Sequence, residues 1–149
     1  SYSRQYSYLI SAEASNQFKI IQGGGGGGNY KEDGTFESNV FSASSSAAFN
    51  RIISTVVKPT QTTIRLQVAS TPQVNGSCIG ASYTYLGPDG STTSFFTPNG
   101  TTISSSIPFG SYGPSYQNPS QCLKYKAWFS TWDTSQTPVL NDVTINYSQ

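Results

Sequence analysis

Histidine, methionine and charged side chains are absent or scarce in this chain of 149 residues. It has no His and no Met, only 10% of its residues are charged, and its net charge is +1. Charged residues make up about a quarter of an ordinary soluble domain. The absence of His excludes Ser-His-Asp and Cys-His catalytic groups. A net charge so close to zero provides no electrostatic attraction for nucleic acid, so we expect no such partner.

The chain also lacks a long apolar run. No stretch reaches the ~18–20 apolar residues that a membrane-spanning helix needs, and no secretory signal sequence is visible. Because residue 1 is not Met, we interpret Ser1 as either a processed N-terminus or an artificial boundary. Hydroxyl and amide groups provide solubility in place of ions, a composition common in domains displayed outside cells. We therefore expect an extracellular or cell-surface location.

Carboxylates are too few to favour an enzyme. A glycosidase needs two of them on either side of a cleft, and Asp89 and Asp133 stand in turn sequences where Asp is expected for structural reasons. We expect no zinc site, because such a site needs three or four Cys or His ligands and the chain has no His. We therefore expect no catalysis and no cofactor, although a structural calcium ion remains an open alternative. Its candidate ligands are Glu32, Asp33, Asp133 and Asp142.

The chain has only two cysteines, Cys78 and Cys122. In a chain that acts outside the cytosol, two cysteines indicate one disulfide first, and two unpaired buried thiols are the alternative. Closing the loop between them should stabilise the fold by about 4 kcal/mol through the entropy of the unfolded chain.

Short alternating segments dominate the sequence after residue 30. Residues 63–69 alternate strictly, with Ile64 and Leu66 on one face and Arg65 and Gln67 on the other. Apolar residues recur in the same way, at period two, in residues 121–131 and 141–147, which predicts strands. Further strands are predicted at residues 35–42, 49–57, 78–86, 93–97 and 101–107, and a long loop at residues 108–121. This pattern predicts an all-β, jelly-roll-like β-sandwich.

Residues 1–30 differ from the rest and form a separate N-terminal segment in our interpretation, with the sandwich at residues 31–149. Residues 6–11 alternate like a strand, whereas residues 11–16 also suit a short helix, so the segment is either extended or partly helical. Six consecutive glycines at residues 23–28 read as a connector. They lack the lysine and hydroxyl residue of a phosphate-binding loop.

Residues 34–147 resemble a β-sandwich domain of bacterial surface and pilin-associated proteins. The resemblance rests on GTFESNVF at residues 34–41, GPDGST at 87–92, and YKAWFST at 125–131 followed by TPVLNDVTINY at 137–147. The last segment is the most specific. Domains similar to it occur as accessory modules of secreted proteins, behind pilin-type helices or beside carbohydrate-active enzymes. This sequence departs from a pilin because it lacks the long apolar N-terminal helix.

Two functions follow from these observations. The first is a non-catalytic structural or adhesive subunit of a filament or pilus-like appendage, which self-associates or joins other surface proteins. Its N-terminal segment would add a strand to a neighbour's sheet, although the same segment could instead fold onto its own sheet. The assembly residues would be Tyr6, Tyr8, Ile10, Phe18 and Ile20.

The alternative function is a carbohydrate-binding module or adhesin, in which aromatic rings stack on sugar faces. Core packing and loop anchoring are the competing roles for the same rings. The candidate platform is Tyr112, Tyr116, Trp128 and Trp132. Three Asn-x-Ser/Thr sequences, at Asn75, Asn99 and Asn146, are candidate glycosylation sites, and the first two fall in predicted turns.

Overall fold

The structure is a computed structural model that describes the backbone of residues 5–9 and the complete residues 30–149. The strands are β1 (Gln5–Leu9), β2 (Asp33–Glu37), β3 (Phe41–Val57), β4 (Thr62–Thr71), β5 (Thr102–Ser106), β6 (Gly110–Ser111), β7 (Gln117–Asn118), β8 (Ser120–Thr131) and β9 (Val139–Ser148). The described residues contain no helix. The predicted all-β, jelly-roll-like sandwich is confirmed.

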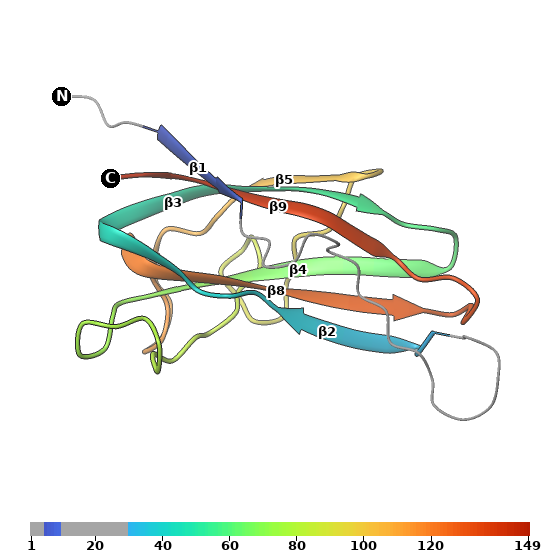
Figure 1. Ribbon diagram of the computed structural model, residues 1–149, viewed down its shortest axis with the longest axis horizontal. Helices are drawn as coiled ribbons and strands as arrows, with labels where there is room; N and C mark the ends of the chain where they lie inside the picture. Colours follow the sequence, from blue (N-terminus) through green and yellow to red (C-terminus); the bar gives the residue numbers. More distant parts are fainter. Residues whose placement is uncertain (1–4, 10–29) are drawn as a thin grey trace.

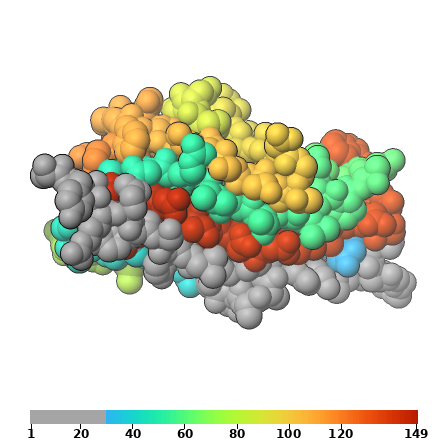
Figure 2. Space-filling view, turned by 90° about the horizontal axis from the view of Figure 1, so that it is seen from above, coloured from blue at the N-terminus to red at the C-terminus, as the bar shows by residue number. Residues whose placement is uncertain are grey.

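Two layers of antiparallel strands face each other (Figure 1). The first layer has the strand order β1-β9-β3-β5. In Figure 2, β9, β3 and β5 appear as neighbouring bands along the molecule. In the second layer β8 lies between β2 and β4. Strand β3 belongs to both layers, because Phe41 and Ser42 pair with β8 whereas residues 48–57 pair with β9.

The core lies between the layers and uses alternate positions of the central strands. One residue from each central strand is fully buried (0% exposed): Ile52 of β3, Leu66 of β4, Leu123 of β8 and Val143 of β9. Successive side chains of a strand point to opposite faces, so one face of each strand enters the core. Burying a side chain of this size contributes about 1.5–3 kcal/mol, which explains why the alternation in the sequence was informative.

The prediction of strands at residues 78–86 and 93–97 is wrong. Gly80 adopts φ 87°, and the Tyr83 hydroxyl donates to the Cys78 carbonyl at 2.8 Å, so the chain turns there instead of extending. Only Leu86 and Phe96 pair with β4, as isolated bridges to Val68 and Leu66. The 72–101 segment therefore follows the edge of β4 as an irregular excursion.

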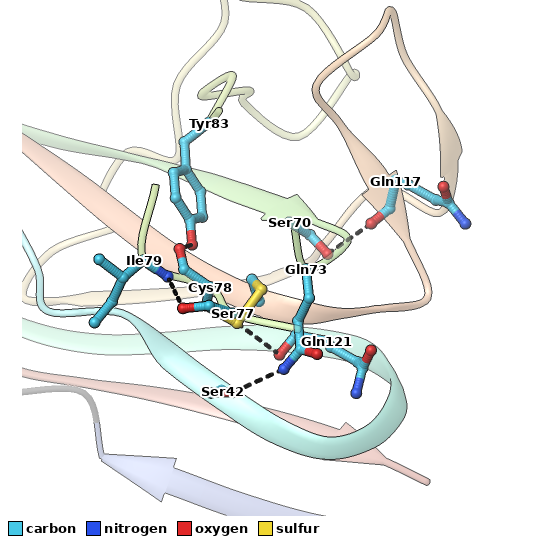
Figure 3. Close-up of a disulfide and its surroundings, with 10 residues drawn as sticks. Ser42, Ser70, Gln73, Ser77, Cys78, Ile79, Tyr83, Gln117 and Gln121 are labelled. Carbon is cyan, nitrogen blue, oxygen red and sulfur yellow. Dashed lines mark hydrogen bonds between the residues drawn. A yellow bond between two sulfur atoms is a disulfide. The ribbon is translucent and has the colours of Figure 1, made fainter. Parts of the chain in front are cut away.

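The predicted disulfide is confirmed. Cys78 and Cys122 are bonded, with Cα atoms 5.5 Å apart, and the bond joins the 72–101 excursion to β8 (Figure 3). Beside it, the Ile79 amide donates to the Ser77 hydroxyl at 3.0 Å, and the Gln73 amide reaches Ser42 at 3.4 Å. The disulfide and the Gln73–Ser42 hydrogen bond hold the start of the excursion against β8 and β3.

The N-terminal strand pairs with the C-terminal one. Gln5 lies opposite Ser148 and Leu9 lies opposite Thr144 in an antiparallel register. Tyr6 and Tyr8 are therefore in a strand, as predicted. Ile10, Phe18, Ile20, the question of a short helix at residues 11–16 and the glycine connector lie outside the described residues.

Candidate functional site

The outer face of the β2–β8–β4 layer gathers charged, hydroxyl and aromatic side chains. Their inward neighbours, among them Ile64, Ala127 and Phe129, are buried in the core, so the intervening residues point outward. Strand register places these outward residues in transverse rows. The rows are Asp33–Ser130–Thr63, Thr35–Trp128–Arg65 and Glu37–Lys126–Gln67.

Cations and aromatic rings alternate across this face. The Arg65 guanidinium carbon lies 3.9 Å from the centre of the Phe95 ring, and Phe95 meets Trp128 edge-on at 5.8 Å. The Lys126 ammonium nitrogen lies 4.3 Å from the centre of the Trp128 ring. Such cation–π contacts each contribute about 0.5–1 kcal/mol at exposed sites. They hold the Arg65 and Trp128 side chains in defined positions.

The Glu37 carboxylate forms ion pairs with two lysines of the face. Lys124 and Lys126 lie 3.3 Å and 3.7 Å from the two carboxylate oxygens of Glu37. Burial, and then the negative charge of Glu37, raise the pKa of the neighbouring Tyr85 hydroxyl well above its usual value. The single Glu37 carboxylate therefore offsets part of the positive charge of the two lysines.

Two hollows adjoin Arg65. One, of about 400 Å³, lies over Trp128 and is lined by Asp33, Thr35, Thr63, Arg65 and Ser130, among others. The other, of about 350 Å³, is lined by Lys58, Thr63, Ile64, Arg65, Thr97, Pro98 and Trp132. Thr63 and Arg65 line both hollows, so the two adjoin one another around the start of β4.

The predicted four-ring sugar platform is not formed. Tyr116 is 1% exposed, and its hydroxyl donates to the Pro108 carbonyl at 2.8 Å. Tyr112 packs edge-on against Tyr116 at 5.7 Å and lies against Gly90, so it anchors loops. Both tyrosines precede β8, whereas Trp128 and Trp132 lie near the end of that strand. Only the two tryptophans adjoin the hollows described above.

The other candidate residues have separate locations. Asn75 and Asn99 are exposed in turns, and Asn146 lies half-buried in β9 between β1 and β3. The Asp133 carboxylate accepts hydrogen bonds from Ser135, which lower its pKa, and Asp142 accepts from Thr55 at 2.6 Å. Residues 30–149 hold no cluster of acidic, Cys or His side chains that could bind a metal ion.

Arg65, Lys58 and Phe95 are the site residues that the sequence analysis missed. Alternation correctly placed Arg65 on the outer face of its strand. Lys58 and Phe95 lie near Arg65 because the β3–β4 turn and the 72–101 excursion fold back on β4. A local sequence pattern cannot predict such a tertiary arrangement.

Comparison with known proteins gives a likeness in fold alone. No protein-family profile matches the chain, and no curated protein does. A chain in the structure of infectious bursal disease virus, Gx strain, aligns with 99% of this chain at a TM-score of 0.51 and 8% identity. A chain in the structure of the Gt strain of the same virus aligns with 97% of this chain, at a TM-score of 0.49 and 10% sequence identity. This chain spans 32% of the length of each.

Among residues 5–9 and 30–149, no helix is long and apolar enough to cross a bilayer.

Proposed function

We propose that this chain is a non-catalytic structural subunit of an extracellular filament or pilus-like appendage, and that it assembles by donating its N-terminal strand. The observation that supports this is the β1–β9 pair. β1 is the outermost strand of its layer, and within the described residues it pairs with β9 alone. Main-chain pairing of this kind is what strand addition between chains uses.

The same β9 edge can accept the strand of another copy. Removing β1 exposes the unpaired backbone groups of Thr144 to Ser148, and such an edge is a template for a strand from another molecule. Residues 10–32 connect β1 to β2. At about 3.3 Å per residue they could extend over roughly 75 Å, which is long enough to reach a neighbour. The six glycines within them impose little steric constraint.

An extracellular setting fits the disulfide. The bond between Cys78 and Cys122 is the kind that forms and persists in oxidising compartments. The low content of charged residues in a Ser- and Thr-rich chain supports the same setting.

The first experiment is the mass and shape of the native particle, measured by light scattering and negative-stain microscopy over a range of concentrations. Strand donation predicts polymers of the full chain. A variant lacking residues 1–22 should remain folded, by circular dichroism, and stay monomeric. A full chain that is monomeric at every concentration refutes the proposal.

A second experiment identifies the donor of the strand. Ser7 lies opposite Asn146 in the β1–β9 register. Opposed Cα atoms in antiparallel strands are about 4.5–5.5 Å apart, which a disulfide can bridge. Single variants Ser7→Cys and Asn146→Cys, mixed and mildly oxidised, should give covalent mixed dimers if β1 comes from a neighbour. The double variant would give linked monomers alone if each chain keeps its own strand.

A further inference from the structure

Trp132 is an exposed aromatic residue whose backbone is held by hydrogen bonds. Its side chain is 72% exposed, although aromatic side chains usually bury their large apolar surface. Its amide donates to the Gln61 carbonyl at 2.8 Å, and the preceding Thr131 hydroxyl donates to the Asp133 carbonyl at 2.6 Å. Trp132 therefore stands on a firmly hydrogen-bonded backbone directly after β8. The end of β8 lies beside the start of β4, where Thr131 pairs with Thr62 (Figure 1).

Two cations line the same hollow as Trp132. Lys58 and Arg65 are both exposed, and within the described residues neither makes an ion pair. No carboxylate lines that hollow. The Arg65 guanidinium is stacked over Phe95, and stacking on its flat face leaves the N–H groups at its edge available to an anion. The hollow therefore combines an aromatic face with an excess of positive charge.

The adjoining hollow extends the site and adds polar, uncharged side chains to its lining. Beyond Arg65 it offers the hydroxyl side chains of Thr35, Thr63 and Ser130. Trp128 also lines this hollow, and its indole N–H is buried without a hydrogen-bond partner among the described residues, which is rare in proteins. Asp33 is the single carboxylate in its lining. An elongated ligand would thus place its anionic group near Lys58 and Arg65, away from Asp33.

We propose that these two hollows form one binding site for an acidic saccharide chain. The negatively charged group, a carboxylate or a sulfate, binds between Lys58 and Arg65, and a sugar ring packs its C–H face on Trp132. Aromatic faces carry partial negative charge and attract polarised C–H groups. The remaining sugar hydroxyls bond to the hydroxyl side chains over Trp128. Arg65 and Trp128 of this site belong to the β2–β8–β4 layer, opposite the layer that contains β1.

The test is calorimetric titration of the full chain at low salt with four probes of matched length. These are an oligosaccharide of galacturonic acid, a sulfated oligosaccharide, a neutral glucose oligosaccharide and a glutamate peptide. We expect one or both acidic saccharides to bind and the other two probes to bind at least about tenfold more weakly, the equivalent of ~1.4 kcal/mol. Which acidic saccharide binds tighter identifies the anionic group.

Three variants locate the site. Trp132→Ala should weaken binding of the acidic saccharide by about tenfold, comparable with the loss of one stacked ring in other aromatic platforms. Lys58→Gln and Arg65→Gln should each weaken it by about fivefold, as for a surface ion pair of ~1 kcal/mol. Thermal melting of each variant verifies that it folds, and Arg65→Lys, which keeps the charge, provides a second test at that position.

Matched controls stand elsewhere on the surface. Phe109→Ala removes a 51% exposed ring, and Arg51→Gln removes an exposed cation that bonds Ser104 in the other layer. Both should leave affinity unchanged. Equal binding of the glutamate peptide would mean a site for acidic peptides, and equal binding of the neutral glucan would remove the role of the cations. Either result, or full affinity in Trp132→Ala, overturns the proposal.

Discussion

Asn118 is predicted to be one of the most sensitive polar residues of the fold. It is 1% exposed, and its side chain makes three hydrogen bonds. Its oxygen accepts from the Phe49 amide at 3.0 Å, and its nitrogen donates to the carbonyls of Phe49 and Pro108, both at 2.9 Å. The pairing of β3 with β5 covers residues 51–55 and does not include Phe49. At Phe49 the Asn118 side chain therefore takes the place of a neighbouring strand.

The magnitude follows from the groups that lose their partners. Asn118→Ala leaves the Phe49 N–H and C=O buried without partners, whereas the Pro108 carbonyl keeps its bond from Tyr116. An orphaned buried group costs about 1–3 kcal/mol. Two of them sum to about 4 kcal/mol, a large share of the 5–15 kcal/mol typical of a domain. For a domain of this size the melting temperature should fall by about 8–16 °C.

The assay is urea unfolding followed by tryptophan fluorescence, with the free energy of unfolding compared between variants. Tyr116→Phe is the matched control, because it removes one donor to Pro108 while Asn118 still satisfies that carbonyl. It should cost about 1 kcal/mol. A loss below about 1 kcal/mol for Asn118→Ala, with an unchanged urea dependence, would show that water replaces the amide and would refute the reasoning.

Three further predictions concern stability. Replacing Cys78 and Cys122 by Ala opens a link across 44 residues and should lower the free energy of unfolding by about 4 kcal/mol, measured in urea. Burial raises the pKa of Tyr125 from 10.0 to about 12, so its stabilising contribution is complete below pH 10 and disappears as the pH rises to 12. Absorbance of tyrosinate should therefore appear together with unfolding, whereas a normal titration before unfolding would contradict the burial argument. A methyl group at Gly87 would overlap the Ser94 backbone, so Gly87→Ala should cost about 1–3 kcal/mol. A neutral effect by thermal melting would show that the 72–101 excursion can shift freely.

Strands with one face in the core could be predicted from the sequence. Residues 63–69 and 121–131 alternate because their inward side chains fill the space between the layers, and they became β4 and β8. The first half of β3 was missed, since its serines and alanines at residues 42–48 carry no apolar alternation. That half is where the strand passes from one layer to the other.

Tertiary contacts explain the remaining errors. Residues 93–97 look like a strand, but the Gln67 side-chain amide occupies the Thr92 and Ser94 carbonyls that a neighbouring strand would use. Of the predicted sugar platform, Tyr116 proved to be a core residue, because its single hydroxyl is satisfied by Pro108. The surroundings of Trp132 depend on Lys58 and Arg65, which turns and register bring near it.

The antiparallel β1–β9 register also determines how the molecule resists mechanical force. Gln5 and Ser148 lie opposite one another at the same end of the pair. Tension that separates the two ends of one chain therefore opens the hydrogen bonds one after another, as in a zipper, and needs little force. Tension carried along β1 through the connector instead loads all five residue pairs at once. A filament built by strand donation would use the second geometry, so its joints would resist pulling better than the isolated subunit does.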